Sequence, residues 1–119
     1  MNSLLLIPLL LLVQASYFDM HGTITDVITP SAIVVNNTTI DLADVNSSGL
    51  THNQYIRLMK DLDTKLLNKD VFVKGDYTYF DLIGSYNSVS INEMIQKMID
   101  DLKDERQRYC DLYCQYLDE

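Results

Sequence analysis

The chain contains few of the residues that interrupt helices and strands, with four Gly and two Pro among 119 residues. It also contains no Trp. With 47% hydrophobic residues, this composition excludes a disordered or collagen-like chain and indicates one globular domain. Cations are also scarce, because nine Lys and Arg stand against 17 Asp and Glu, for a formal net charge of −8. An acidic surface repels phosphate backbones, so nucleic-acid binding would need a local basic patch or a bound cation.

Long apolar runs are absent except at Leu4–Val13, which reads LLLIPLLLLV. Ten residues are too few to span a bilayer but are typical of the apolar region of a secretory signal. The segment before the run carries no Lys or Arg, which departs from the usual signal pattern. We expect cleavage after Ala15, so that residues 1–15 are a signal peptide and the rest is secreted or extracytoplasmic, with no stable membrane span. The alternative is an uncleaved anchor or a buried helix.

Three Asn-X-Ser/Thr sequons follow, at Asn36, Asn37 and Asn46. In an exported chain they are candidates for N-glycosylation. They are equally explained by chance, because they lie in turn segments rich in Asn, Ser and Thr.

The first half of the chain is predicted to form a three-stranded meander. His21–Ile28 alternates imperfectly, and Ala32–Val35 is rich in β-branched residues. Asn36-Asn37 predicts a tight hairpin turn, because Asn tolerates positive φ. Thr38–Val45 alternates until Asp44, where we expect the strand to end or bend.

An amphipathic helix over residues 51–67 follows, with Thr51 and Gln54 forming a capping-box pattern. Val71–Val73 predicts a fourth strand, and Tyr77–Tyr86 a fifth with a bulge or bend at Gly84.

Ser90–Leu117 is predicted to be helical, either as one helix or as two with a bend near Asp104. Its apolar residues approach a heptad spacing, so this helix either packs on its own domain or pairs two chains into a homodimer.

Three strands, a helix, two strands and a helix predict an α+β fold. The order fits a five-stranded OB-type barrel with the amphipathic helix between strands three and four and a C-terminal helical tail. The expected boundaries are residues 16–89 for the barrel and residues 90–119 for the tail.

The segment Gly22–Ile95 resembles the staphylococcal nuclease (thermonuclease) family. GTITDVITPSAIVV is similar to the opening hairpin of that family, and TTIDLADVNSS to its third strand. YIRLMKDLDTKLLNKDVFVKG is similar to its first helix and the next strand, and VSINEMI to the strand-to-helix step that commonly reads V-N-x-x-L.

The resemblance implies a bound calcium ion, two arginines and a glutamate around a scissile phosphate, which would stabilise phosphoryl charge and activate water. The matching positions here do not carry these groups. The D-G-D turn corresponds to Thr29-Pro30-Ser31, the first arginine to Asp41 and the metal-binding aspartate to Asn46. The glutamate falls near Gly49 and the second arginine near Tyr79.

We therefore expect a secreted or envelope-facing binding module that is not an enzyme, a degenerate family member with no cofactor or metal. Its ligand is left open among an oligonucleotide, a saccharide and a protein. One alternative is a divergent calcium-dependent nuclease that hydrolyses phosphodiester bonds. Another is an interaction protein that pairs through the C-terminal helix.

The candidates to face a ligand are polar residues at or beside the family's functional positions and the tyrosines of an aromatic strand. Tyr77 and Tyr79 share one face of a strand, and Phe80 lies on the other, so one set is expected in the core. The tyrosine rings could stack bases or sugars, or simply pack on the barrel. The candidate ligand-facing residues are Ser31, Asp41, Asn46, Ser47, Tyr77 and Tyr79.

Cys110 and Cys114 are four residues apart in a helical stretch. Export favours oxidised cysteines, but an intrahelical bridge at this spacing is strained. The open readings are a disulfide that distorts the helix end and disulfides to a second chain.

Overall fold

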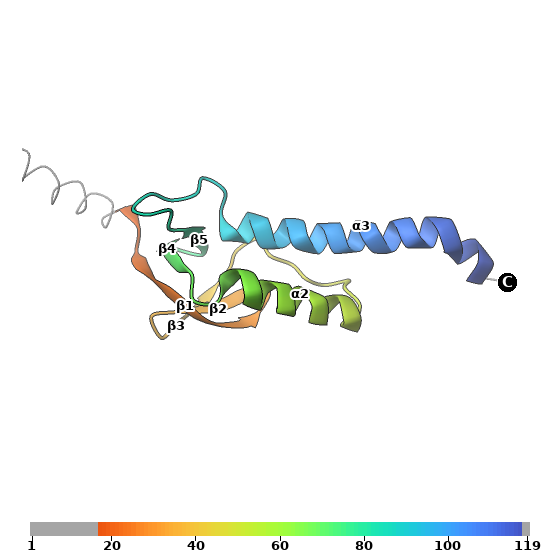
Figure 1. The fold of residues 1–119 in the computed structure, drawn as a ribbon, viewed down its shortest axis with the longest axis horizontal. Helices are drawn as coiled ribbons and strands as arrows, with labels where there is room; N and C mark the ends of the chain where they lie inside the picture. The colour runs from red at the N-terminus through yellow and green to blue at the C-terminus, as the bar shows by residue number, and fades with distance from the viewer. Residues whose placement is uncertain (1–16, 118–119) are drawn as a thin grey trace, which may run out of the picture.

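The computed structural model describes residues 17–117, and side chains only for residues 17–105, 107 and 108. The expected signal peptide at residues 1–15 lies outside this range. The described chain is an α+β fold with a five-stranded antiparallel sheet and two helices (Figure 1). Its elements are β1 (Met20–Thr29), β2 (Ala32–Val35), β3 (Thr38–Asp41), α2 (His52–Leu66), β4 (Asp70–Lys74), β5 (Tyr77–Phe80) and α3 (Ile91–Leu117).

The sheet has the strand order β3-β2-β1-β4-β5. β1 is the longest strand and belongs to two ladders. Its first residues, Met20–Thr23, pair with β4, and Ile24–Thr29 pair with β2. β1 therefore joins a β1–β2–β3 meander to a β4–β5 hairpin.

The imperfect alternation of β1 has a structural cause. The pairing with β2 is irregular between Ile24 and Asp26 and again between Val27 and Thr29. This shift lets both Ile24 and Val27 face the core, although regular pleating would put them on opposite faces. Ile28 is left exposed.

One hydrophobic core lies between the sheet and the two helices. Leu58, Leu62 and Leu66 of α2 are buried, as are Ile91, Ile95 and Ile99 of α3. The strands contribute Ile24, Val27, Ile33, Val35, Ile40, Val71 and Val73.

The turns and the capping box match the sequence predictions. Asn36 and Asn37 have φ values of 51° and 61°, as a tight hairpin turn requires. The Thr51 hydroxyl accepts from the Gln54 amide, and the Gln54 side chain accepts from the Thr51 amide, which closes the capping box of α2.

Two strand predictions were too long. The third strand ends at Asp41, before the end or bend that we expected at Asp44, where φ is 63°. The fifth strand ends at Phe80 rather than at Tyr86. Ile83 and Gly84 both have positive φ, and the chain folds back so that Asp81 pairs with Tyr86. Of the two predictions for Gly84, the bend is confirmed, because Gly84 lies in a reverse turn and not in a bulge within a strand.

α3 runs without interruption from Ile91 to Leu117, so the C-terminal region is one helix. It lies beside α2 and continues past it (Figure 1). The Gln54 side-chain amide donates to the Leu102 carbonyl at 2.9 Å, and Arg57 lies 3.6 Å from Glu105, so the two helices are also joined by polar contacts.

β3 and β5 are the two edges of the sheet, so the sheet is not closed into a barrel. One backbone hydrogen bond of 3.0 Å crosses the gap, from the Ala43 amide just after β3 to the Asp76 carbonyl in the β4–β5 turn. The first turn of α3 lies against this point.

Candidate functional site

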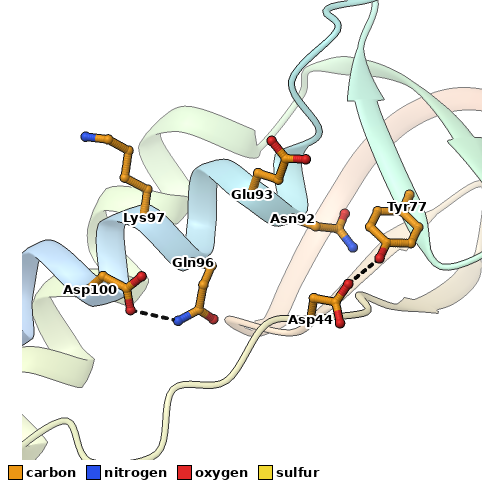
Figure 2. A pocket seen from close by; sticks show the side chains of 7 residues that line it. All are labelled: Asp44, Tyr77, Asn92, Glu93, Gln96, Lys97 and Asp100. Carbon is orange, nitrogen blue, oxygen red and sulfur yellow. Dashed lines mark hydrogen bonds between the residues drawn. The ribbon is translucent and has the colours of Figure 1, made fainter.

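A cleft of about 340 Å³ opens where the chain after β3, the start of β5 and the first turns of α3 meet (Figure 2). These three segments are far apart in the sequence. The lining side chains are Asp44, Tyr77, Asn92, Glu93, Gln96, Lys97 and Asp100.

Asn92 holds the three segments together. Its side-chain amide donates to the Ala43 carbonyl at 2.9 Å and to the Asp76 carbonyl at 2.7 Å. Its side-chain oxygen accepts from the Thr78 amide at 3.2 Å. Asn92 is only 1% exposed, so its polar atoms are satisfied by the protein itself. This side chain therefore fixes the floor of the cleft.

Tyr77 and Asp44 form one wall of the cleft. The Tyr77 hydroxyl donates a short hydrogen bond to the Asp44 carboxylate (Figure 2). The bond and the nearby carboxylate charge raise the pKa of Tyr77 above its ordinary value, because ionisation would break the bond and place two negative charges together. Tyr77 therefore stays a neutral donor at physiological pH.

Gln96 ties α3 to the loop after β3. Its side-chain oxygen accepts from the Asn46 amide at 2.7 Å, and its amide group donates to Asp100 at 3.0 Å. Lys97 lies 3.6 Å from Asp101, so its charge is shared with a carboxylate outside the cleft. The lining of the cleft thus includes three carboxylates, of Asp44, Glu93 and Asp100, and one ammonium group, of Lys97.

The six sequence-predicted ligand-facing residues do not form one site. Tyr77 lines the cleft, whereas Tyr79 packs against Phe18 and Tyr86 on the outer face of the sheet. That face is the one opposite the core, because Thr78 is buried and Phe80 packs on the core.

The other four predicted residues lie at the edge of the sheet. Ser31 is in the β1–β2 turn, where its carbonyl accepts from the Leu42 amide, and Asp41 is exposed at the end of β3. Asn46 and Ser47 follow in the loop beside α3, and the Asn46 side chain accepts from the Ser48 amide at 2.9 Å.

Sequence reasoning identified Tyr77 and missed the other six cleft residues, which are Asp44, Asn92, Glu93, Gln96, Lys97 and Asp100. An α-helix turns once per 3.6 residues, so positions 92, 93, 96, 97 and 100 share one face. That polar face at the start of a predicted helix is a signal that the sequence does contain. This signal alone does not predict the cleft, because only the fold shows that Asp44 and Tyr77 lie opposite this face of the helix.

The sequons differ in their surroundings. The Asn36 side-chain amide donates to the His21 carbonyl at 3.0 Å, so the nitrogen that would carry a glycan is already engaged. Asn37 and Asn46 are exposed. Glycosylation stays a prediction at all three positions.

The side chains of Cys110 and Cys114 lie outside the described residues, so their pairing stays a prediction. Among the described residues, no group of three or more His, Cys, Asp or Glu side chains is arranged to hold a metal ion. Over the same part of the chain, no helix combines the length and the apolar character needed to cross a bilayer.

Comparisons with protein-family models, with curated proteins and with solved structures found no match to this chain. The resemblance to the staphylococcal nuclease family therefore remains a proposal based on the residues.

Proposed function

We propose that this chain is an exported, non-catalytic binding module on an OB-type scaffold similar to that of the staphylococcal nuclease family. We further propose that its cleft binds a Lys or Arg side chain from a basic segment of a partner protein. The single observation that carries the ligand class is the excess of carboxylates over cations around the cleft.

The strand order supports the scaffold proposal. In a five-stranded OB barrel, the first strand lies between the second and fourth, and the third and fifth strands meet. The sheet order β3-β2-β1-β4-β5 has the same neighbours, and the bond from Ala43 to Asp76 lies where closure would occur. Asn92, within the stretch that resembles V-N-x-x-L, bridges the same two segments.

The positions where the family carries its catalytic groups support the absence of catalysis. Asp41 is exposed and acidic where the resemblance implies an arginine. Tyr79, near the position of the second arginine, is packed among other aromatic rings. A phosphodiester needs cationic groups at the reacting phosphate, and these positions supply none.

The chemistry of the cleft favours a cationic ligand over an oligonucleotide. Carboxylates attract and orient groups that donate hydrogen bonds, and they repel phosphates. Glu93 is exposed on α3 and lines the same cleft as Tyr77 (Figure 2). An ammonium or guanidinium group in the cleft would meet both charge and an aromatic ring, which together favour binding.

The proposal is tested with a fluorescein-labelled hexapeptide of alternating lysine and glycine. We expect fluorescence polarisation to show binding that weakens steeply as salt is raised, since the attraction is electrostatic. The same peptide with acetylated lysines should bind at least tenfold more weakly. Glu93→Gln and Asp100→Asn should each weaken binding severalfold.

Asp104→Asn is the matched control, because Asp104 is an exposed carboxylate on α3 outside the cleft. It should leave the affinity unchanged. An equal loss in all three variants would mean diffuse charge attraction and would reject the site. Salt-independent binding of maltotetraose or chitotetraose in place of the peptide would instead identify a saccharide module.

The nuclease alternative is tested on the same preparation with single-stranded DNA, RNA and calcium. We expect no cleavage above a chelator-treated sample. Cleavage that requires calcium and is removed by a chelator would overturn the non-catalytic proposal.

A further inference from the structure

An aromatic cluster covers the outer face of the sheet, opposite the core. Phe18 is its centre and is 6% exposed. Its ring centroid lies 4.8 Å from that of Phe72 and 5.1 Å from that of Tyr86. Tyr17 and Tyr86 stack at 6.4 Å and form the rim, at 52% and 46% exposure. We call these residues, together with Tyr79, the aromatic face.

The turn after β5 carries two large apolar side chains into solvent beside this face. Leu82 is 52% exposed and Ile83 is fully exposed. The Leu82 amide donates to the Ser85 carbonyl at 2.5 Å, which closes the turn. Ile83 has a φ of 57°, a conformation that costs a β-branched residue about 1–2 kcal/mol. A strained, solvent-facing isoleucine has no role in the core, and such strain is often kept for function.

The apolar run Leu4–Val13 ends close in the sequence to Tyr17, which belongs to this face. Only three residues separate Val13 from Tyr17. As a helix, ten residues would extend about 15 Å, roughly half the thickness of the hydrocarbon core of a bilayer. A run of this length inserted into lipid would therefore hold Tyr17 and its neighbours at the bilayer surface.

The polar groups around the aromatic face suit that position. Tyr side chains favour the boundary between lipid and water, and Lys can extend its ammonium group to the headgroups. The Lys74 ammonium lies 4.0 Å from the Tyr17 ring centroid and donates to the Tyr17 carbonyl. The nearby carboxylates are occupied, because Asp81 accepts from Gly84 and contacts His21, and Asp19 accepts from Gly75.

We propose that Leu82 and Ile83 insert into the surface of a zwitterionic lipid bilayer, with Tyr17 and Tyr86 at the interface. The bilayer is zwitterionic because a chain of net charge −8 is repelled by anionic lipid. The proposal concerns the full chain, before any cleavage after Ala15, and does not depend on the ligand of the cleft.

The absence of Trp from the chain gives a direct test, because one introduced Trp is the only such fluorophore. Leu82→Trp and Ile83→Trp are made separately in the full chain, so that one remains informative if the other fails to fold. Ile56→Trp on α2 is the control, because Ile56 is exposed at 39% on a different element. Each protein is synthesised cell-free with and without phosphatidylcholine vesicles.

We expect a blue shift and quenching by brominated lipid at positions 82 and 83, and neither at position 56. The double variant Leu82→Asp/Ile83→Asp should reduce partition into vesicles by on the order of tenfold, because about 1.4 kcal/mol of apolar transfer is lost. Ile56→Asp should not reduce it.

Equal shifts at all three positions would mean that the apolar run binds lipid without orienting the domain, and would overturn the proposal. No shift at positions 82 and 83 would also overturn it. A shift that needs no vesicles but grows with protein concentration would show that this face binds a second copy of the chain instead.

Discussion

Asn92 is the residue on which the geometry of the cleft depends most. It is a buried polar side chain that makes three hydrogen bonds to backbone groups of other segments and accepts a fourth, longer one from the Thr78 hydroxyl. A buried amide is costly unless every polar atom is paired, and here the pairing itself joins the loop after β3 to the β4–β5 turn. The same side chain therefore contributes to stability and positions the candidate site.

Asn92→Ala should lower the free energy of unfolding by about 2–4 kcal/mol, because the Ala43 carbonyl and the amide of buried Thr78 lose their bonds to this side chain and the Asp76 carbonyl keeps only its bond from the Ala43 amide. Urea denaturation followed by circular dichroism measures this loss. Asn53→Ala, an exposed change on α2, should stay within about 0.5 kcal/mol of the parent chain. Equal stability of the two variants would show that the Asn92 contacts do not join these segments.

Tyr77 gives a prediction about pH. Its pKa is raised in the folded state, chiefly by its hydrogen bond to Asp44, so the bond stabilises the fold below the unfolded pKa of about 10. That contribution is lost as the pH rises through the raised folded pKa. Ultraviolet titration of the parent chain and of Tyr77→Phe gives a difference curve that reports on Tyr77 alone. We expect this tyrosine to ionise at a higher pH than an exposed tyrosine. Ionisation of that tyrosine at or below its ordinary pKa would contradict the contact with Asp44.

At the scale of elements, local signals predicted most of the fold. The capping box at Thr51, the Asn36-Asn37 turn and the β-branched run Ala32–Val35 are each encoded within a few residues. The strand ends were less predictable. The chain after Asp41 and the chain after Phe80 each contain a residue with positive φ, Asp44 and Ile83. Asp tolerates this conformation, but Ile rarely adopts it, so nothing in the apolar alternation marks where either strand ends.

The candidate site was predicted less well than the fold. Tyr77 was identified because it lies on a strand with other aromatic residues. Its partner Asp44 lies 33 residues away, and α3 supplies the rest of the cleft. Such convergence depends on how the two edges of the sheet approach each other, which no short segment specifies.

The turn at Ile83 allows a test of backbone strain. Ile83→Asn should raise the free energy of unfolding by about 1 kcal/mol, because Asn tolerates positive φ and no buried contact is lost. Val89→Asn, at an exposed position without positive φ, should bring no such gain. Thermal unfolding of both variants makes the comparison, and a destabilised Ile83→Asn would mean that Ile83 makes contacts that the exposed position does not indicate.

The close packing of Gly22, in β1, against Asn36 allows a further prediction about stability. A Cβ at Gly22 would lie 2.1 Å from the Asn36 side-chain oxygen, so Gly22→Ala should destabilise the fold by about 1–3 kcal/mol. Asn36→Gly removes the obstructing side chain and suits the φ of 51°. The double variant should therefore lose less than the sum of the two single variants. Simple additivity in urea denaturation would show that the two positions do not interact.

At the scale of the whole molecule, the chain after β3 and the β4–β5 turn meet at the first turn of α3, and the cleft lies at this junction. The aromatic face lies on the outside of β4 and β5, so ligand binding and lipid contact are assigned to different surfaces. One domain could then be held at a membrane while its cleft stays accessible. The acidic charge of the chain favours a basic partner at the cleft and a zwitterionic rather than an anionic bilayer at the aromatic face.

The most direct test of the central claim is an NMR titration of the isotope-labelled chain with the lysine–glycine hexapeptide. The account predicts backbone shifts confined to Asp44–Ser47, to Tyr77 and to the first turns of α3 around Asn92–Lys97, and no such shifts with the acetylated peptide. Shifts scattered over acidic residues elsewhere, or confined to the aromatic face, would contradict the assignment of the cleft as the binding site.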